Sequence, residues 1–393
     1  MDLMSDELFS RIVAIRRDLH RHPELSEQEF ETANKVCAYL DNLGLQYQRN
    51  VAGHGILAEI PSGNPEAPTI ALRADMDALP IFEQTGLAFA SANEGVMHAC
   101  AHDGHMSILL GAAELILQEP DLPVNVRLLF QPAEEIGKGA RDMVEAGVLE
   151  GVSAIFGGHL DRHYPLNTLI VTDGAVNASS DKFRIEIKGT GGHAARPHEA
   201  VDAVVIGSLL VMSIQTIVSR EVNPAHPSVV TVGRFDAGTA ANVIAGHAIL
   251  EGSIRAQEPE VQEGLHESIR RICASVAQLH CADISVEIEL GTPVLKNPPR
   301  ETAIARAAAT TVVGEENVRK MEIANMGGED FSYYMQKIPG CYIRIGTTVE
   351  GVEAFPAHSD RFDFDERAMM VGARYYHALV LEAGAKLALE GKL

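Results

Sequence analysis

The stretch that decides the fold is TIALRADMDALP, residues Thr69–Pro80. It begins as an apolar run with the length of a buried strand and ends with two carboxylates, Asp75 and Asp77, which leave the strand together. In isolation these carboxylates would indicate only a polar turn after a strand. The sequence on either side decides whether they belong to a functional site.

Two further apolar runs downstream repeat this arrangement. Val124–Phe130 is followed by Glu134 and Glu135, and Ala154–Phe156 is followed by His159. Helical patterns between the runs cover Ser107–Leu117 and Gly137–Ala146. The alternation of strands and helices predicts parallel βαβ units with right-handed crossovers. Because the carboxyl ends of parallel strands meet at one edge of a sheet, we expect the polar residues to gather there.

A second pattern begins at Asp181–Lys188, where apolar and charged residues alternate as in a half-solvated strand. The elements that follow it are a helix near Ala200–Ser219, strands at Ser228–Arg234 and Ala248–Arg255, a helix near Val261–Leu279 and a strand at Ile284–Leu290. This βαββαβ order is that of a ferredoxin-like α+β unit. Helices would cover one face of its sheet and leave the other face or an edge for a second subunit.

The predicted fold class is therefore α/β, with a mainly parallel α/β/α catalytic domain interrupted by a ferredoxin-like lid or dimerisation domain. Residues 1–180 and 294–393 are expected to form the catalytic domain, and residues 181–293 the inserted domain. A chain of 393 residues is long enough for two cores.

Composition limits the partners and the compartment. The formal net charge of -22 argues against nucleic acid and anionic membranes, which require a basic face. Five sparse cysteines do not suggest a disulfide framework, so we expect a reducing compartment, the cytoplasm. The first residues lack the pattern of a signal peptide, and the longest apolar run, Val201–Ile217, is broken by Asp202.

The stretch MHACAHDGH, residues Met97–His105, combines thiol, imidazole and carboxylate groups. A thiolate and an imidazole two residues apart, at Cys100 and His102, can turn toward one cation. The alternative is a polar loop around a half-buried cysteine. A later loop carries one more histidine, His358.

Five candidate metal ligands collect at the predicted sheet edge: Cys100, His102, Glu135, His159 and His358. Their number and mixed chemistry exceed one tetrahedral site and fit a two-metal site. Glu134 lies beside them, so that one carboxylate of the Glu134-Glu135 pair can bind metal while the other accepts a proton. A solvated turn is the competing interpretation of that pair.

Other polar residues are expected to serve the structure. Ser26–Glu29 resembles a capping box that begins a second helix, and His20 and His22 lie apart from other ligand types. Asp103 is equally suited to cap the following helix or to pair with an imidazole. We expect these residues of Met97–His105 to support the ligands or to begin the helix: His98, Asp103 and His105.

Taken together, the motifs resemble the dinuclear metal amidohydrolase and peptidase family that includes hippurate hydrolase, indole-3-acetyl-amino-acid hydrolases and N-acyl-L-amino-acid amidohydrolases. The resemblance covers nearly the whole chain. The segments that carry it are Arg17–Ser26, Leu72–Pro80, Met97–His105, Phe130–Glu135, Gly191–His198, Ala241–Ile244, Glu329–Phe331 and Pro356–His358.

The resemblance implies that the five candidate ligands bind two divalent metal ions. It also implies that Glu134 is the general acid and base, that Asp77 orients a ligand and that His193 stabilises the oxyanion, in its own site or in a partner's. Asn242 is a candidate for holding substrate, or else an Asn that closes a turn. Zinc or manganese suits the ligand set best, and cobalt or nickel is allowed.

The chain departs from the family pattern at Ala101 and Gly328, where relatives more often have Gly and Ser, and in Leu160–Pro165, which borders the site. If Ala101 has a negative φ, the substitution should be tolerated, but otherwise it carries a cost. The change after His159 bears on substrate preference more than on chemistry.

We predict hydrolysis of the amide bond of a small-molecule N-acyl amino acid by a homodimer or higher homo-oligomer. An aminoacyl or dipeptide exopeptidase on the same scaffold is the closest alternative. A non-catalytic metal-binding dimerisation protein and a structural zinc module are others, but the complete ligand set and the absence of Cys-x-x-Cys argue against them.

Overall fold

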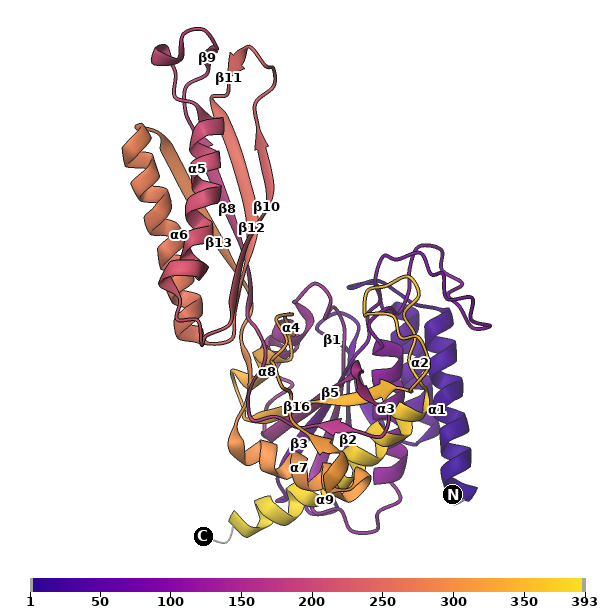
Figure 1. The fold of residues 1–393 in the computed structure, drawn as a ribbon. Coiled ribbons are helices and arrows are strands. Elements are labelled where there is room, and N and C mark those ends of the chain that lie inside the picture. Colours follow the sequence, from indigo (N-terminus) through magenta and orange to yellow (C-terminus); the bar gives the residue numbers. More distant parts are fainter. Residues whose placement is uncertain (1–2, 391–393) are drawn as a thin grey trace. The chain divides into compact units, whose positions relative to one another are not determined.

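The computed structural model describes residues 3–390, which form two compact units (Figure 1). Unit 1 comprises Met1–Gly174, Lys296–Glu322 and Asp330–Leu393, and unit 2 comprises Ala175–Leu295 and Ile323–Glu329. The segment Ile323–Glu329 was expected in the first domain, but the structure groups it with unit 2.

Unit 1 is built on an eight-stranded sheet in the order β1-β2-β4-β3-β5-β16-β6-β15. The central strands β4, β3, β5 and β16 run parallel. Strands β1 and β2 pair antiparallel with their neighbours, whereas β6 pairs antiparallel with β16 and parallel with β15. The strands are β1 Gln46–Val51, β2 Gly55–Ile60, β3 Thr69–Asp75, β4 Asn125–Gln131, β5 Val152–Pro165, β6 Leu169–Ile170, β15 Val318–Arg319 and β16 Gly340–Thr348.

Helices cover both faces of this sheet, which explains why its central strands are nearly continuous apolar runs. Consecutive strand residues point to opposite faces. At Gly157 a Cβ would contact Phe331, next to α8, whereas at Gly158 it would lie near Tyr376 of α9. The helices of unit 1 are α1 Leu3–Arg21, α2 Phe30–Asn42, α3 His102–Ile116, α4 Gly139–Glu145, α7 Pro299–Val313, α8 Ser332–Met335 and α9 Arg367–Glu390.

Unit 2 has the ferredoxin-like topology, with an antiparallel sheet in the order β10-β12-β8-β13. The alternation in β8 is confirmed, because Phe183, Ile185 and Ile187 are buried. Figure 1 shows α5 and α6 along the same side of this sheet. The elements are β7 Gly174–Asn177, β8 Ser180–Lys188, β9 Gly192–His193, α5 Ala203–Thr216, β10 Ser228–Ala237, β11 Val243–Ile244, β12 His247–Ala256, α6 Pro259–His280, β13 Asp283–Thr292 and β14 Leu295–Asn297.

Helix α5 differs from the expectation of an interrupted apolar run. Asp202 precedes the helix as its N-cap and accepts hydrogen bonds from two backbone N–H groups, so it does not interrupt the helix. Together with the turn that follows, Ala203–Glu221 is long and apolar enough to cross a membrane, with a mean hydropathy of 1.7. Ile206, Leu210 and Ile214 are nevertheless buried at helical spacing, as in a helix that packs on a sheet.

Two sequence predictions in unit 1 are wrong. The capping box is absent, because the side chain of the N-cap residue Glu29 makes no capping hydrogen bond and Ser26 instead donates to Asp77, 2.7 Å away. The Glu24 carboxylate accepts from the first N–H groups of α2 in its place. His159 was expected after the end of a strand, but β5 extends to Pro165 and includes it. The reason is the long parallel ladder with β16, in which His159 pairs with Arg344.

Candidate metal centre

Cys100 and His102 lie where a loop leads into α3, which begins at His102. The residue between them, Ala101, has a φ of 65°, in the left-handed region. An L-residue with a Cβ pays roughly 1 kcal/mol for this conformation, which glycine would adopt without that cost, so the condition of a negative φ at Ala101 is not met. The site therefore contains local backbone strain between two candidate ligands.

The structure brings all five predicted metal ligands together within unit 1. They form overlapping sets whose ligand atoms lie within 4.8 Å of one another. Cys100 joins His102 and His159 in one set, and Glu135 and His358 in another. A further set contains His102, Glu134 and Glu135. Overlapping sets of this kind are what two neighbouring cations with shared ligands require.

His102 is oriented by the backbone of Asp77. Its Nδ1 lies 2.8 Å from the Asp77 carbonyl oxygen, and because a carbonyl only accepts, Nδ1 carries a proton and Nε2 is the ring atom left to bind a cation. Within residues 3–390, this buried Nε2 and the buried Oε1 of Glu135 have no hydrogen-bond partner, and they lie 3.7 Å apart. Buried polar atoms are rarely left unsatisfied, so this pair fits a cation held between them.

The electrostatics of the cluster also fit a cation. Burial lowers the pKa of His102, but Asp75 and Asp77 outweigh it and raise that pKa well above its ordinary value. Burial and the Glu135 carboxylate raise the pKa of the Cys100 thiol. Both shifts reflect excess negative charge around the ligand atoms, which a divalent cation would neutralise.

Asp77 contacts two of the candidate ligands. Its Oδ2 accepts hydrogen bonds from the backbone N–H of Glu135, at 3.0 Å, and from the Ser26 hydroxyl. Its backbone carbonyl accepts from His102. The side chain is buried beneath the site and is in position to orient both ligands.

Glu134 and Glu135 follow a second strained residue, Ala133, with a φ of 56°. The backbone N–H of Ala133 donates to Oε1 of the buried Glu29 at 2.8 Å, so Glu29 supports the turn that presents the two carboxylates. Glu134 Oε1 accepts from the Asp330 N–H at 3.5 Å. The turn thus gives adjacent carboxylates different surroundings.

His159 faces Cys100, with Nε2 at 3.4 Å from Sγ. Its Nδ1 donates to the Leu160 carbonyl at 2.7 Å, which leaves Nε2 as the free ligand atom. Burial, together with His105 and Arg344, holds the pKa of His159 well below its ordinary value. A neutral imidazole is the form that binds metal.

His358 reaches the cluster from the loop before α9. It also has a positive φ, 66°, and its backbone N–H donates to the Ala99 carbonyl at 2.8 Å. Its Nε2 lies 3.4 Å from Glu135 Oε2, and its side chain is 55% exposed, in contrast to the buried His102. The solvent-facing side of the cluster therefore lies at His358.

The two remaining predicted residues lie in unit 2, where a short ribbon brings them together. His193 in β9 pairs with Val243 in β11, and the Ala194 N–H donates to the Asn242 carbonyl at 3.2 Å. His193 is exposed, and its Nδ1 accepts from the Ala195 N–H. The structure thus places both residues on one exposed ribbon of that unit.

Sequence reasoning missed a buried network beneath the centre. Arg73 donates to Asp75 at 2.6 Å, to Gln131 at 2.8 Å and to Asp330 at 2.8 Å, and all four residues are buried. The sequence did offer a signal for this network, namely the charged Arg73 inside an apolar strand with the carboxylate of Asp75 two residues later. Asp103 is not a cap, because it lies within α3 and pairs with His20 and Arg16, both at 2.9 Å.

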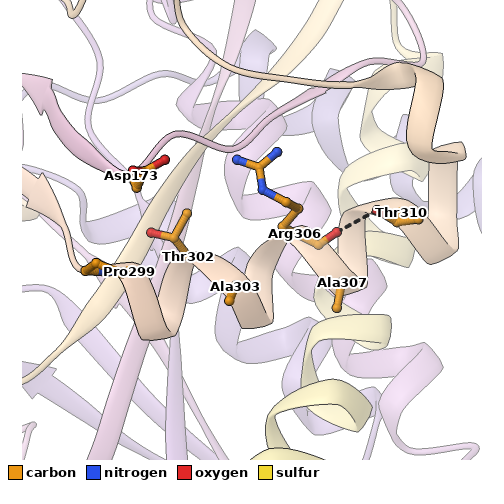
Figure 2. A pocket seen from close by; sticks show the side chains of 7 residues that line it. All are labelled: Asp173, Pro299, Thr302, Ala303, Arg306, Ala307 and Thr310. Carbon is orange, nitrogen blue, oxygen red and sulfur yellow. Dashed lines mark hydrogen bonds between the residues drawn. The ribbon is translucent and has the colours of Figure 1, made fainter.

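A surface hollow of about 520 Å³ lies elsewhere in unit 1, along α7 (Figure 2). Asp173 and one face of α7 line it, and the Arg306 guanidinium donates to the Val171 carbonyl. None of the predicted site residues is among its lining residues, which include neither a thiol nor an imidazole in the described part of the chain.

Comparisons with known proteins identify a family of enzymes whose activity is compatible with a metal centre of this composition. Residues 71–382 match the model of peptidase family M20/M25/M40. The chain is 40% identical to N-acetylcysteine deacetylase of Bacillus subtilis, over 96% of this chain and 98% of that protein. It is 36% identical to thermostable carboxypeptidase 2 of Saccharolobus solfataricus, over 97% of each.

Among solved structures, a Bacillus subtilis protein described as a dinuclear metal binding peptidase of the M20 family superposes with a TM-score of 0.84. The two are 36% identical, over 96% of this chain and 98% of that one. These matches extend across both units. The chain is therefore a hydrolase that belongs to peptidase family M20/M25/M40.

Proposed function

We propose that this enzyme hydrolyses the amide bond of N-acyl amino acids at a centre of two divalent cations. Cys100, His102, Glu135, His159 and His358 would hold the cations. The observation that carries the proposal is the buried, unpartnered pair of His102 Nε2 and Glu135 Oε1 within the described residues. The similarity to a protein named N-acetylcysteine deacetylase supports the substrate class.

The chemistry follows from the positions of the side chains. When bound, divalent cations would lower the pKa of a water molecule and polarise the acyl carbonyl. Glu134 takes a proton from the attacking water on a carboxylate oxygen and returns it to the leaving amine nitrogen. Asp77 holds His102 and Glu135 in place through the contacts described above. The products are a carboxylic acid and an amino acid.

Zinc or manganese is the proposed metal. The thiolate and imidazole ligands suit zinc, whereas the carboxylate suits manganese, and cobalt or nickel would also be accepted. Native metal content, measured on protein purified without added metal, tests this choice.

The resemblance to the family also gives roles to two residues on the ribbon of unit 2. His193 would donate a hydrogen bond to the oxyanion, in its own site or in a partner's, and Asn242 would hold substrate. We further propose a cytoplasmic homodimer that pairs through unit 2. The edge strand β10 exposes Val229 and Phe235, and α5 exposes apolar side chains on its outer face: Val204, Val205 and Met212. A monomeric mass at micromolar concentration would contradict the dimer.

An exopeptidase on the same scaffold remains the second candidate, because a relative of equal coverage is named a carboxypeptidase. The deciding experiment is a substrate panel on metal-stripped enzyme reconstituted with each metal. It compares N-acetyl, benzoyl and indole-acetyl amino acids with unblocked dipeptides. Turnover confined to the dipeptides would replace the amidohydrolase proposal with the exopeptidase.

A further inference from the structure

Two histidines hold the backbone of Leu160, one at its N–H and the other at its carbonyl. Its N–H donates to His105 Nε2 at 3.0 Å, and its carbonyl accepts from His159 Nδ1 at 2.7 Å. The rings of His105 and His159 also meet edge to face, with centroids 4.7 Å apart. Leu160 and the two rings therefore form one packed unit that includes the candidate ligand His159.

These contacts determine the tautomer of His105. A backbone N–H can only donate, so Nε2 of His105 must accept and carries no proton. The ring proton then resides on Nδ1, which donates to Asp75 Oδ1 at 2.7 Å. His105 and Asp75 are both buried, so no water competes for these bonds.

Asp75 is itself fixed and is not available as a metal ligand. Its Oδ2 accepts from Arg73 at 2.6 Å, while its Oδ1 accepts from His105, so both oxygens are engaged. Arg73 is held in turn by Asp330. Asp75, His102 and His105 together have the composition of a metal site, but Asp75 and His105 are already engaged in hydrogen bonds to each other, to Arg73 and to the Leu160 N–H.

Leu160 is also packed against the residue before His105. A Cβ at Gly104 would lie 2.6 Å from Leu160 Cδ1, so only glycine admits this approach. The helix that carries His102 and the strand that carries His159 thus meet at the contact between His105 and Leu160.

From this geometry we propose that His105 and Asp75 are a positioning pair that sets the orientation of His159 through the backbone of Leu160. The pair does not touch the cations. It holds the N–H of Leu160, the residue whose carbonyl accepts from His159 Nδ1, and that second bond turns His159 Nε2 toward Cys100. The inference rests on the proposed metal centre.

Two amide substitutions separate the contacts of His105. The amide of Gln reaches the position of the imidazole Nε2, so His105→Gln can still accept from the Leu160 N–H. The shorter amide of Asn reaches only the position of Nδ1, so His105→Asn keeps a donor for Asp75 but loses Leu160. Asp75→Asn is a second disruptive variant, because an amide donor facing Nδ1 would force the proton onto Nε2, opposite the Leu160 N–H.

The test is titration of metal-free protein with Co²⁺ against a chelator, with the visible absorption of the thiolate-bound ion recorded. We expect His105→Asn and Asp75→Asn to weaken one of two cobalt sites about 10- to 100-fold and to alter the spectrum. His105→Gln should stay close to wild type. His98→Leu is the matched control, since His98 is buried in the same motif and has no hydrogen-bond partner within residues 3–390.

Wild-type affinity and spectrum in both disruptive variants would overturn the positioning role, as would equal losses in His105→Gln and His105→Asn. If either His105→Asn or Asp75→Asn fails to melt cooperatively and is therefore not folded, the cobalt affinity of the other variant tests the proposal. Wild-type protein that binds no cobalt would instead refute the proposed metal centre, so the two failures are distinguishable.

Discussion

Nε2 of His102 lies 3.7 Å from Oε1 of Glu135, and both atoms are buried without a hydrogen-bond partner in the described part of the chain. Neighbouring Glu134 belongs to the same set but also accepts a backbone N–H. The adjacent carboxylates thus have different surroundings, since one is turned to the imidazole and the other to a backbone N–H. This difference can be tested by substituting each carboxylate with its amide.

Glu134→Gln should retain the metal and lose catalysis. The amide keeps the size of the side chain but cannot carry a proton between water and the leaving nitrogen, so kcat should fall by about 10²- to 10⁴-fold. Metal content by elemental analysis and kcat on an N-acetyl amino acid are the measurements. Glu135→Gln is the matched variant, and it should lose metal affinity. Activity of Glu134→Gln within a few-fold of wild type would exclude the proton-transfer role.

His20 should make stability depend on pH above neutrality. Burial lowers its pKa, but hydrogen bonds to Asp103 and Glu83 outweigh this and raise it to about 9, above the ordinary value of 6.5. The folded state therefore keeps a proton that the unfolded chain releases. The contribution of this proton to the free energy of unfolding is complete below pH 6.5 and is lost as the pH rises through 9.

The measurement is the difference in unfolding free energy between wild type and His20→Gln across pH 6 to 9.5. One pKa unit corresponds to about 1.4 kcal/mol, so this difference should shrink by about 3 kcal/mol as the pH rises. His22→Gln, at an exposed position nearby, controls for loss of an imidazole. A constant difference for His20→Gln would contradict the assignment.

The sequence was informative wherever local periodicity determines the structure. The apolar runs of β3 and β4 and the alternation in β8 were enough to predict the parallel sheet and the ferredoxin-like unit. Prediction from the sequence failed where contacts between distant segments determine which hydrogen bonds a side chain makes. Ser26 and Glu29 have the spacing of a capping box, but Asp77 and the Ala133 N–H bind them instead. Such contacts exist only after distant segments meet.

In the candidate site, too, some features could be predicted from the sequence and others could not. Motif residues such as Cys100 and His102 could be recognised because their types are unusual in a loop. The hydrogen bonds of Asp75 and His105 could not be predicted, because they depend on which backbone N–H faces a ring nitrogen in the folded chain. The strain at Ala101 also depends on a φ angle that the sequence does not give.

Replacing Ala101 with glycine should stabilise the chain. At a φ of 65° the alanine Cβ costs roughly 1 kcal/mol, and glycine removes that cost while adding some entropy to the unfolded chain. The net gain should be about 0.5 kcal/mol, measured by denaturant unfolding. Ala112→Gly, at a buried position inside α3, is the matched control and should lose about 1 kcal/mol. Destabilisation by both substitutions would show that Ala101 is not strained.

Glu29 should give a pH dependence below neutrality. Burial raises its pKa to about 7 from 4.5, and the nearby Asp77 carboxylate adds to the shift. Between these values the folded state holds a proton that the unfolded chain has released, so stability falls as the pH rises from 4.5 to 7. Below pH 4.5 both states are protonated, and the cost of ionising the buried group is absent.

Glu29→Gln removes this cost and still offers an oxygen to the Ala133 N–H. The variant should therefore be more stable than wild type at pH 8, by up to about 3 kcal/mol, and should lose that advantage near pH 4.5. Urea unfolding of both proteins at matched pH values measures the effect. Glu31→Gln, at an exposed position in the first turn of α2, is the control for a changed net charge. If Glu29→Gln and Glu31→Gln follow the same pH profile, Glu29 ionises without a burial cost.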